Sequence, residues 1–73
     1  MITAKIVCQT KVESGEGDER QVNVTFVPDY ADDRNKEWAR YTPGLSLIMG
    51  LRGAVADKFE VGQAFELQFV PES

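Results

Sequence analysis

The sequence predicts a mainly β domain of the α+β class, in which four antiparallel strands form a small twisted sheet or an open barrel with one short helix. Three observations support this fold class. Four short segments alternate between apolar and polar residues, as half-buried strands do. Turn-forming residues separate them, and the segment between the second and third strands has no such alternation. A chain of 73 residues has room for one domain, residues 1–73.

The first two segments predict a hairpin. The first strand, residues 2–12, has a two-residue repeat that places on one side Ile2, Ala4, Ile6, Cys8, Thr10 and Val12. The acidic loop ESGEGDE follows at 13–19, and the second strand, RQVNVTFVP, points inward Val22, Val24 and Phe26. Pro28 ends this strand or places it at an edge, because proline cannot donate to a β ladder.

The remaining segments predict a helix and a second hairpin-like pair of strands. Residues 29–43 contain a helix of two or three turns, which Asp32 or Asp33 caps and which Thr42-Pro43-Gly44 ends. The third strand covers residues 45–51 and the last strand covers residues 64–70. Between them lies a connection with one helical turn and then a tight turn, in which Gly62 takes a positive φ.

The apolar side of this pattern predicts a single core, made of Ile6, Cys8, Val22, Val24, Phe26, Leu45, Leu47, Met49, Phe59, Phe65, Leu67 and Phe69. Each strand also carries one apolar residue on its outer face, and these are Val7, Val27, Ile48 and Val70. Scattered apolar residues are normal on a protein surface. The alternative is that the four residues form an interface, covered by the helix or by another subunit.

No residue pattern indicates an enzyme. The chain has no His and one cysteine, Cys8, which excludes serine-type triads, a disulfide within the chain, and metal sites built on His or Cys. Two carboxylate pairs, Asp32 with Asp33 and Glu16 with Asp18, lie in what read as open loops, where we expect nothing to shift a pKa. The loop at 13–19 lacks the ligand spacing of a calcium loop. We therefore expect no catalytic residue, no cofactor and no metal.

A candidate binding face lies in the segment without alternation. Aromatic and arginine side chains commonly anchor interfaces, and this segment contains Tyr30, Arg34, Trp38, Arg40 and Tyr41. Residues 34–58 carry five basic and two acidic side chains, so the same set can also stack on single-stranded bases, although the chain's net charge of −4 argues against nucleic acid. The structural alternative is that Trp38 and Tyr41 pack on the sheet as a lid over the core.

The run from Glu37 to Phe69 resembles a group of short proteins encoded by tailed bacteriophages. The likeness rests on Trp38 followed by YTPGLSLIMG, and on FEVGQAFELQF, which has the pattern Phe-x-x-Gly-x-x-aromatic-x-Leu/Val-x-Phe. The hairpin SGEGDERQVNVTFVP is similar to the first half of these proteins. Gly44-Leu45-Ser46 and RGAVADKF depart from the turns usual in the group. The resemblance implies a viral origin and a small β-rich fold, and it carries over no catalytic residue.

Together these features predict a non-enzymatic bacteriophage accessory protein that acts by binding another macromolecule or by self-assembly, as a virion component or a binder of a host factor. We expect a protein partner and a homo-oligomer. The alternative function is binding of single-stranded nucleic acid or a nucleotide-like anion through residues 30–58. The N-terminal residues do not read as a signal peptide, and no apolar run approaches the about 20 residues of a membrane span. We therefore expect no membrane partner, and a location in the cytoplasm of the infected bacterial host or in the virion.

Overall fold

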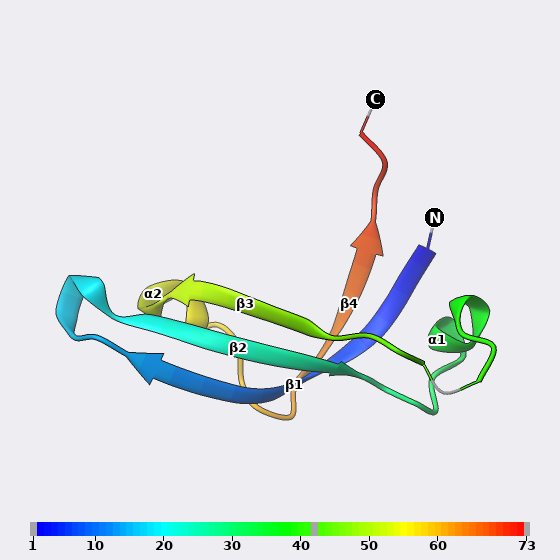
Figure 1. Cartoon of the computed structure of the whole chain (residues 1–73), viewed down its shortest axis with the longest axis horizontal. Helices are drawn as coiled ribbons and strands as arrows, with labels where there is room; N and C mark the ends of the chain where they lie inside the picture. The colour runs from blue at the N-terminus through cyan, green and yellow to red at the C-terminus, as the bar shows by residue number, and fades with distance from the viewer. Residues whose placement is uncertain (1, 42, 73) are drawn as a thin grey trace.

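The computed structural model describes residues 2–41 and 43–72 (Figure 1). Its elements in chain order are β1 (Ile2–Ser14), the 3-10 helix η1 (Gly17–Glu19), β2 (Gln21–Pro28), α1 (Asp33–Trp38), β3 (Leu47–Arg52), α2 (Gly53–Ala56) and β4 (Ala64–Phe69). The strands form one antiparallel sheet in the order β3-β2-β1-β4. The predicted fold class is confirmed.

The long strand β1 belongs to two parts of the sheet. Residues 2–7 pair with β4, and residues 6–14 pair with β2. The strand bends between these two parts, so that the N-terminal half of β1 and β4 project away from the rest of the sheet (Figure 1). We call residues 2–7 of β1 with β4 the arm, and β2, β3, α2 and the rest of β1 the body. The molecule measures 43 × 32 × 16 Å.

A β-bulge in β1 changes which side chains face the core. The pairing with β2 shifts register between Cys8 and Thr10, and an extra residue on one strand moves all later side chains to the opposite face. Lys11 therefore lies opposite the buried Val24, and its Nζ donates a hydrogen bond to the carbonyl of Phe59 at 2.9 Å. Val12 lies opposite Asn23 and is 61 % exposed. The prediction that Thr10 and Val12 share one side of the strand with Ile6 and Cys8 is wrong for this reason.

The second hairpin-like pair does not form. β3 pairs with β2 and β4 pairs with β1, so that β3 and β4 stand at opposite edges of the sheet. The connection between them contains α2 and Phe59, which pack against the buried core residues. The chain crosses the sheet because these apolar groups occupy its inner face, which we define as the face that carries Ala4, Ile6, Cys8, Val22, Val24 and Phe26.

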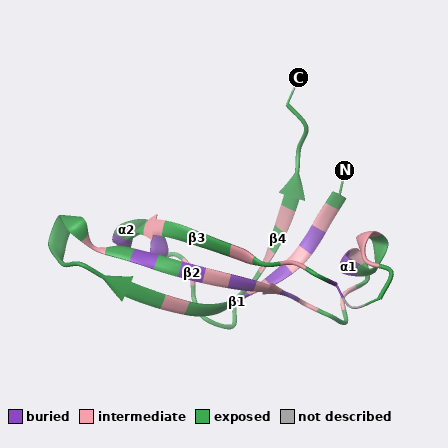
Figure 2. Ribbon diagram, in the orientation of Figure 1, coloured by how far each residue is buried: buried purple, intermediate pink, exposed green. Residues whose placement is uncertain are grey.

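The buried core runs along β2 and into the N-terminal half of β1, with α2 beside it (Figure 2). Its residues are Ala4, Ile6, Cys8, Val22, Val24, Phe26 and Ala56. Phe26, Phe59 and Phe65 meet above them, with ring centroids 5.1–6.0 Å apart and two edge-to-face pairs. Five other residues of the predicted core are only partly buried around this cluster: Leu45, Leu47, Phe59, Phe65 and Leu67. Met49 and Phe69 are 39 % and 55 % exposed, so their prediction as core residues is wrong.

Several local predictions are confirmed. Pro28 is the last residue of β2. The side chain of Asp32 accepts a hydrogen bond from the backbone N–H of Arg34 and caps α1. Gly62 has a φ of 91°, a conformation that glycine adopts without strain. The predicted end of the helix at Thr42-Pro43-Gly44 lies partly outside the described residues, and α1 itself ends earlier, at Trp38.

Candidate binding surface

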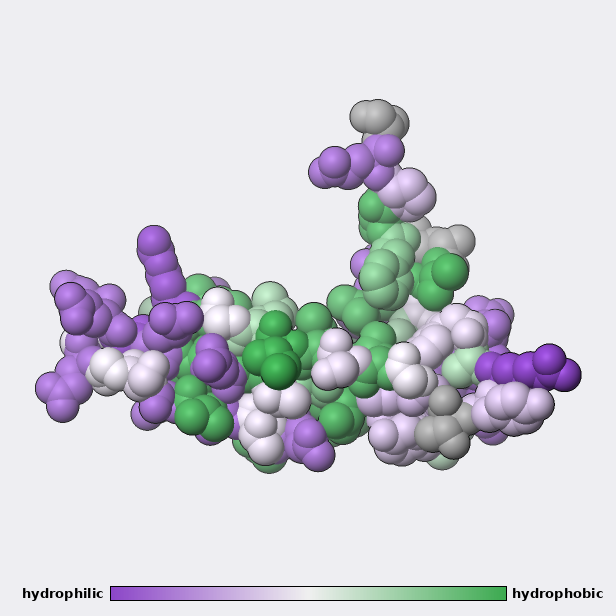
Figure 3. All heavy atoms as spheres, in the orientation of Figure 1, coloured by the Kyte–Doolittle hydropathy of each residue, from purple (hydrophilic) through white to green (hydrophobic). Residues whose placement is uncertain are grey.

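An apolar groove lies on the inner face of the arm. Its volume is about 330 Å³, and it is lined by Ile2, Ala4, Trp38, Gly44, Leu45 and Phe69. Ile2 and Phe69 are each 55 % exposed. Figure 3 shows apolar residues along the arm and in the middle of the body, and hydrophilic residues at the end of the β1–β2 hairpin.

The groove is open at the end of the arm, where Ile2 and Phe69 are exposed, whereas Ala4 and Ile6 on the same inner face are buried. Ile2 pairs with Phe69, and Ala4 with Leu67, so the two strands present a continuous apolar surface. Trp38 is half-buried at its margin. The indole Nε1 of Trp38 is buried and has no hydrogen-bond partner among residues 2–41 and 43–72.

Asn35 fixes the position of α1 beside this groove. Its side-chain oxygen accepts a hydrogen bond from the backbone N–H of Lys5 at 2.9 Å, and its amide nitrogen donates to the carbonyls of Lys5 and Asp29 at 2.9 and 2.7 Å. Asn35 is completely buried. Asp29 N also donates to the Lys5 carbonyl, at 3.1 Å, so the Asn35 amide bridges Lys5 and Asp29 at the point where the ladder between β1 and β2 ends. The helix is therefore held at a strand edge and not across a sheet face.

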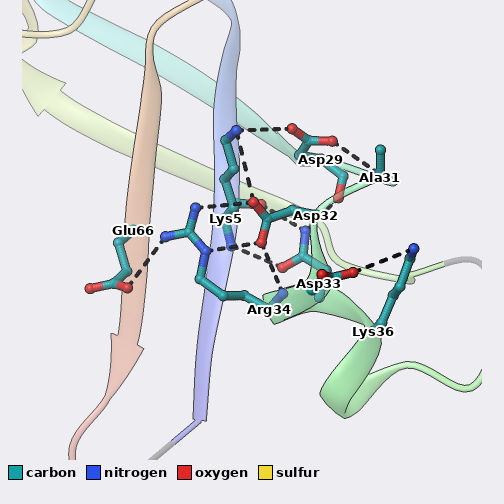
Figure 4. Close-up of polar contacts among 9 residues, drawn as sticks. Lys5, Asp29, Ala31, Asp32, Asp33, Arg34, Lys36 and Glu66 are labelled. Atoms are coloured by element: carbon teal, nitrogen blue, oxygen red, sulfur yellow. Dashed lines mark hydrogen bonds and ion pairs between the residues drawn. The ribbon is translucent and has the colours of Figure 1, made fainter.

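Four charged residues surround this anchor. The Lys5 ammonium lies 3.2 Å from the Asp29 carboxylate and 3.9 Å from that of Asp32. The Arg34 guanidinium lies 2.9 Å from Asp32 and also reaches Glu66 on β4 at 3.4 Å. Figure 4 shows these side chains converging from β1, β4 and the start of α1. We call them, with Glu66, the Lys5 cluster.

The Lys5 cluster shifts the ionisation of its carboxylates. Hydrogen bonds from the side chain and backbone of Arg34 lower the pKa of Asp32 to about 2. The backbone N–H of Ala31 and the Lys5 ammonium lower the pKa of Asp29. The prediction of no shift for Asp32 is wrong, because the sequence does not reveal that Arg34 folds back onto it. Both carboxylates are held in the ionised form, which suits ion pairing and not acid catalysis.

The five residues of the predicted binding face lie in different environments. Arg34 belongs to the Lys5 cluster, and Trp38 lines the apolar groove. Tyr30 is 58 % exposed in the turn before α1, and Tyr41 is 81 % exposed. The structure brings together Arg40 and Tyr41, whose guanidinium carbon lies 5.5 Å from the ring centroid. The lid interpretation therefore fits Trp38 and does not fit Tyr41.

The four predicted interface residues also differ in exposure. Val7 and Val27 are direct cross-strand partners on the outer face and are partly buried. Ile48 lies opposite Thr25 and is 65 % exposed. Val70 follows the last residue of β4 and is 66 % exposed.

A second charged cluster lies at the far end of the body. The Arg20 guanidinium bonds to the carboxylates of Glu13 and Asp57, and its backbone carbonyl accepts from Gly53 N at 3.1 Å. These bonds raise the pKa of Arg20, with Asp57 the larger cause, and lower that of Asp57. A shallow hollow of about 570 Å³ beside it is lined by Arg20 and Arg52 together with Gly17, Asp18, Gly53, Ala54 and Asp57. Because Arg20 already binds two carboxylates, we assign it a structural role that attaches the hairpin to α2.

Sequence analysis did not single out Asn35, Ile2 or Arg20. One feature of the sequence could have pointed to Asn35. Asparagine competes with helix formation by bonding backbone groups, so it is unusual inside a six-residue helix. No sequence signal marks Ile2 as a groove residue, since its exposure depends on where α1 lies.

Across residues 2–41 and 43–72, no group of three or more His, Cys, Asp or Glu side chains is placed to hold a metal ion. No described helix is long and apolar enough to cross a membrane. A scan against models of known protein families, a search of curated proteins and a search of solved structures found no match to this chain.

Proposed function

We propose that this chain is a non-enzymatic bacteriophage accessory protein that acts by binding a protein or by self-assembly, and that the apolar groove is part of its contact surface. The bacteriophage origin rests on the resemblance of residues 37–69 to short phage proteins. It implies a place in the infected host's cytoplasm or in the virion. The binding role rests on the surface of the molecule.

The observation that carries the binding role is an excess of exposed surface. The chain exposes 5475 Å², whereas a compact monomer of 8.2 kDa exposes about 4500 Å². Its radius of gyration is 14.0 Å, against about 11 Å for a compact domain of this length. Part of this extra surface is apolar, since Ile2, Met49 and Phe69 on the inner face are 39–55 % exposed. Exposed apolar patches of this kind mark sites of protein association.

The chemistry of the polar groups supports a binding role over an enzymatic one. Lys5, Asp29, Asp32 and Arg34 are paired with one another. Their bonds fix α1 beside the groove and lower the pKa of both Asp29 and Asp32, which keeps these two carboxyl groups ionised and unsuited to acid catalysis.

The test compares two substitutions of similar exposure. Ile2→Asp places a charge in the groove, whereas Val12→Asp places one on the outer face of the body, where the residue is 61 % exposed. We expect the wild-type chain and the Val12→Asp variant, tagged and recovered from infected cells or virions, to be in a stoichiometric complex by native mass spectrometry. The Ile2→Asp variant should be free. A wild-type chain recovered only at its own 8.2 kDa, and absent from virions, would refute the proposal.

One observation favours a second function, binding of single-stranded nucleic acid or a nucleotide-like anion. The exposed pair of Arg40 and Tyr41 is a cation–π arrangement on which a base can stack. Arg52 and Lys58 make no ion pair with any described residue. Fluorescence anisotropy with a labelled oligonucleotide at low salt should then show binding that weakens several-fold in Tyr41→Ala and falls with added salt. A flat titration rejects this second function.

A further inference from the structure

We propose that the partner is a second copy of this chain, and that β4 pairs antiparallel with β4 of that copy, with Leu67 opposite its own symmetry mate. This inference rests on the proposed binding role and names the partner and the register. A two-fold axis then passes between the two Leu67 residues, and the four-stranded sheet becomes an eight-stranded one.

The free edge of β4 has unpaired backbone groups in the right places. Cys8 N donates to Gln63 O at 2.9 Å, and Gly62 N donates to Cys8 O at 2.8 Å. Hydrogen-bonded pairs alternate along an antiparallel ladder, so the peptide groups of Phe65, Leu67 and Phe69 face β1. Those of Ala64, Glu66 and Gln68 then face away from the sheet, because β4 is the last strand in its order. Neither a proline nor a bulge blocks this edge within Ala64–Phe69.

Side-chain complementarity selects the register. Glu66 is the only charged residue in β4, and pairing it with its symmetry mate would place two carboxylates directly opposite each other, which is unfavourable. Sliding one strand by two residues places Glu66 opposite Gln68 of the second copy and Leu67 opposite Leu67. Phe65 then lies opposite Phe69. Within one chain the Gln68 amide already donates to Glu66 at 2.7 Å, so this pair is chemically suited to the contact.

The same register explains the apolar residues of the outer face. Val27 pairs with Val7, and Val7 pairs with Ala64. In the dimer Ala64 lies opposite Val70 of the second copy. Three of the four predicted interface residues, Val7, Val27 and Val70, thereby join one apolar row that crosses four strands. In a single chain this row stops at Ala64, and Val70 stands apart from it.

The chain as a whole has surplus surface that association can bury. The chain exposes about 900 Å² more than a compact monomer of its mass, and a standard interface buries about 800 Å² per partner. The charge at this edge is also compensated, because Arg34 lies 3.4 Å from Glu66. Two chains of net charge −4 can therefore approach at β4 without bringing unpaired carboxylates together.

The opposite edge, β3, is less complementary to itself. By the same alternation its outward peptide groups belong to Ile48, Gly50 and Arg52. Two-fold pairing there sets Gly50 opposite itself or opposite Ile48, so the central outer-face pair lacks at least one side chain. β3 therefore serves as the matched control.

The first experiment is sedimentation equilibrium of the purified full-length chain and two proline variants. Gln68→Pro removes an outward N–H from β4, and Ile48→Pro removes one from β3; proline at such edge positions leaves the intramolecular ladder intact. We expect the wild type and Ile48→Pro at twice the mass of one chain. Gln68→Pro should dissociate at least about tenfold more readily, because each dimer loses two hydrogen bonds. A monomeric wild type, or dissociation in Ile48→Pro alone, overturns the proposal.

The second experiment tests the register in case Gln68→Pro fails to fold. Under mild oxidation Leu67→Cys should form a covalent dimer, because residue 67 lies opposite itself. Glu66→Cys should not, because it lies opposite residue 68. The wild-type chain is the blank, since its Cys8 is only 1 % exposed. Crosslinking of Glu66→Cys with none of Leu67→Cys overturns the register.

These outcomes are separable from failure of the proposed function. If the wild-type chain does not dimerise but forms a complex with another protein, and Ile2→Asp abolishes that complex, the binding role is retained and the dimer is rejected. If the chain dimerises and binds no other protein, self-assembly is retained and the host or virion partner is rejected.

Discussion

The body and the arm of this sheet are built from the same kinds of strands, yet their inner faces differ in coverage. In the body Val22 and Val24 are completely buried and Phe26 is 2 % exposed, whereas in the arm Ile2 and Phe69 are 55 % exposed. The helix over the body has four residues and the helix beside the arm has six. Helix length therefore does not decide coverage. The anchor decides it, because α2 inserts Ala56 into the core while α1 is bound through Asn35 to the edge of β1.

This difference assigns separate roles to the two regions. The body has its own core of buried side chains and can support the fold. The arm buries Ala4 and Ile6 but exposes Ile2 and Phe69 at its end, where it presents an apolar surface. Substitutions in the two regions test this difference, and we expect the largest loss of folding stability from a substitution in the body.

Phe26→Ala should lower the free energy of unfolding by about 3–5 kcal/mol, because it removes a fully buried ring and leaves a cavity. Phe26 also makes edge-to-face contacts with Phe59 and Phe65, at 5.7 and 6.0 Å. Urea denaturation followed by circular dichroism measures the change. A loss below about 1 kcal/mol would contradict the assignment of the core to the body.

The next largest effect is expected at the anchor of α1. Asn35→Ala removes three hydrogen bonds and leaves the N–H of Lys5 without its partner, which should cost about 2–4 kcal/mol. The Lys5 amide should also exchange with deuterium faster than its neighbours in β1. Lys36→Ala is the control, because Lys36 is exposed on the same helix and makes only an ion pair with Asp33. Equal effects of the two substitutions would mean that Asn35 does not hold the helix.

The body was more predictable from the sequence than the arm, and the reason lies in the type of interaction. Alternation identifies Val22, Val24 and Phe26 because burial on one face of a strand follows a two-residue repeat. The repeat also predicted four strands, and its absence over residues 29–43, together with a capping aspartate, predicted the helix between the second and third. It failed after Cys8, because a bulge adds one residue to the strand and leaves no mark in the composition of the sequence.

The candidate site could be predicted only in part. Trp38 was expected on the sheet or in a binding face, and it lines the groove. The openness of the groove depends on a contact between Asn35 and Lys5, which are 30 positions apart in sequence. Alternation and helix signals describe near neighbours in the chain, so they carry no information about such a contact. For the same reason the edge positions of β3 and β4 were not predicted.

A smaller effect on stability is expected from the arm. Phe69→Ala should lower the free energy of unfolding by about 1 kcal/mol, because only part of this ring is buried. The measurement belongs at a concentration where the chain is monomeric, since the ring also lies in the proposed dimer contact. Its loss should then be far smaller than that of Phe26→Ala. Similar losses at the two positions would show that the inner face of the arm is covered in solution.

The smallest expected effect is a pH dependence of stability that comes from the Lys5 cluster. The pKa of Asp32 is about 2 in the folded chain, below its ordinary value of 3.8, so the unfolded chain takes up the proton first as the pH falls. The contribution of Asp32 to stability is therefore complete above pH 3.8 and is lost between about pH 3.8 and 2. Asp29 and Asp57, whose pKa values are also lowered, act in the same direction.

Asp32→Asn separates the charge from the helix cap, because asparagine caps a helix as well as aspartate does. We expect this variant to be less stable than the wild type at pH 6 and to lose less stability between pH 4 and pH 2, as measured by urea midpoints with Trp38 fluorescence. Asp57→Asn makes the matched change in the body, beside Arg20. If Asp57→Asn flattens the pH profile and Asp32→Asn does not, the acid sensitivity belongs to the body, and the Lys5 cluster does not hold the arm in place.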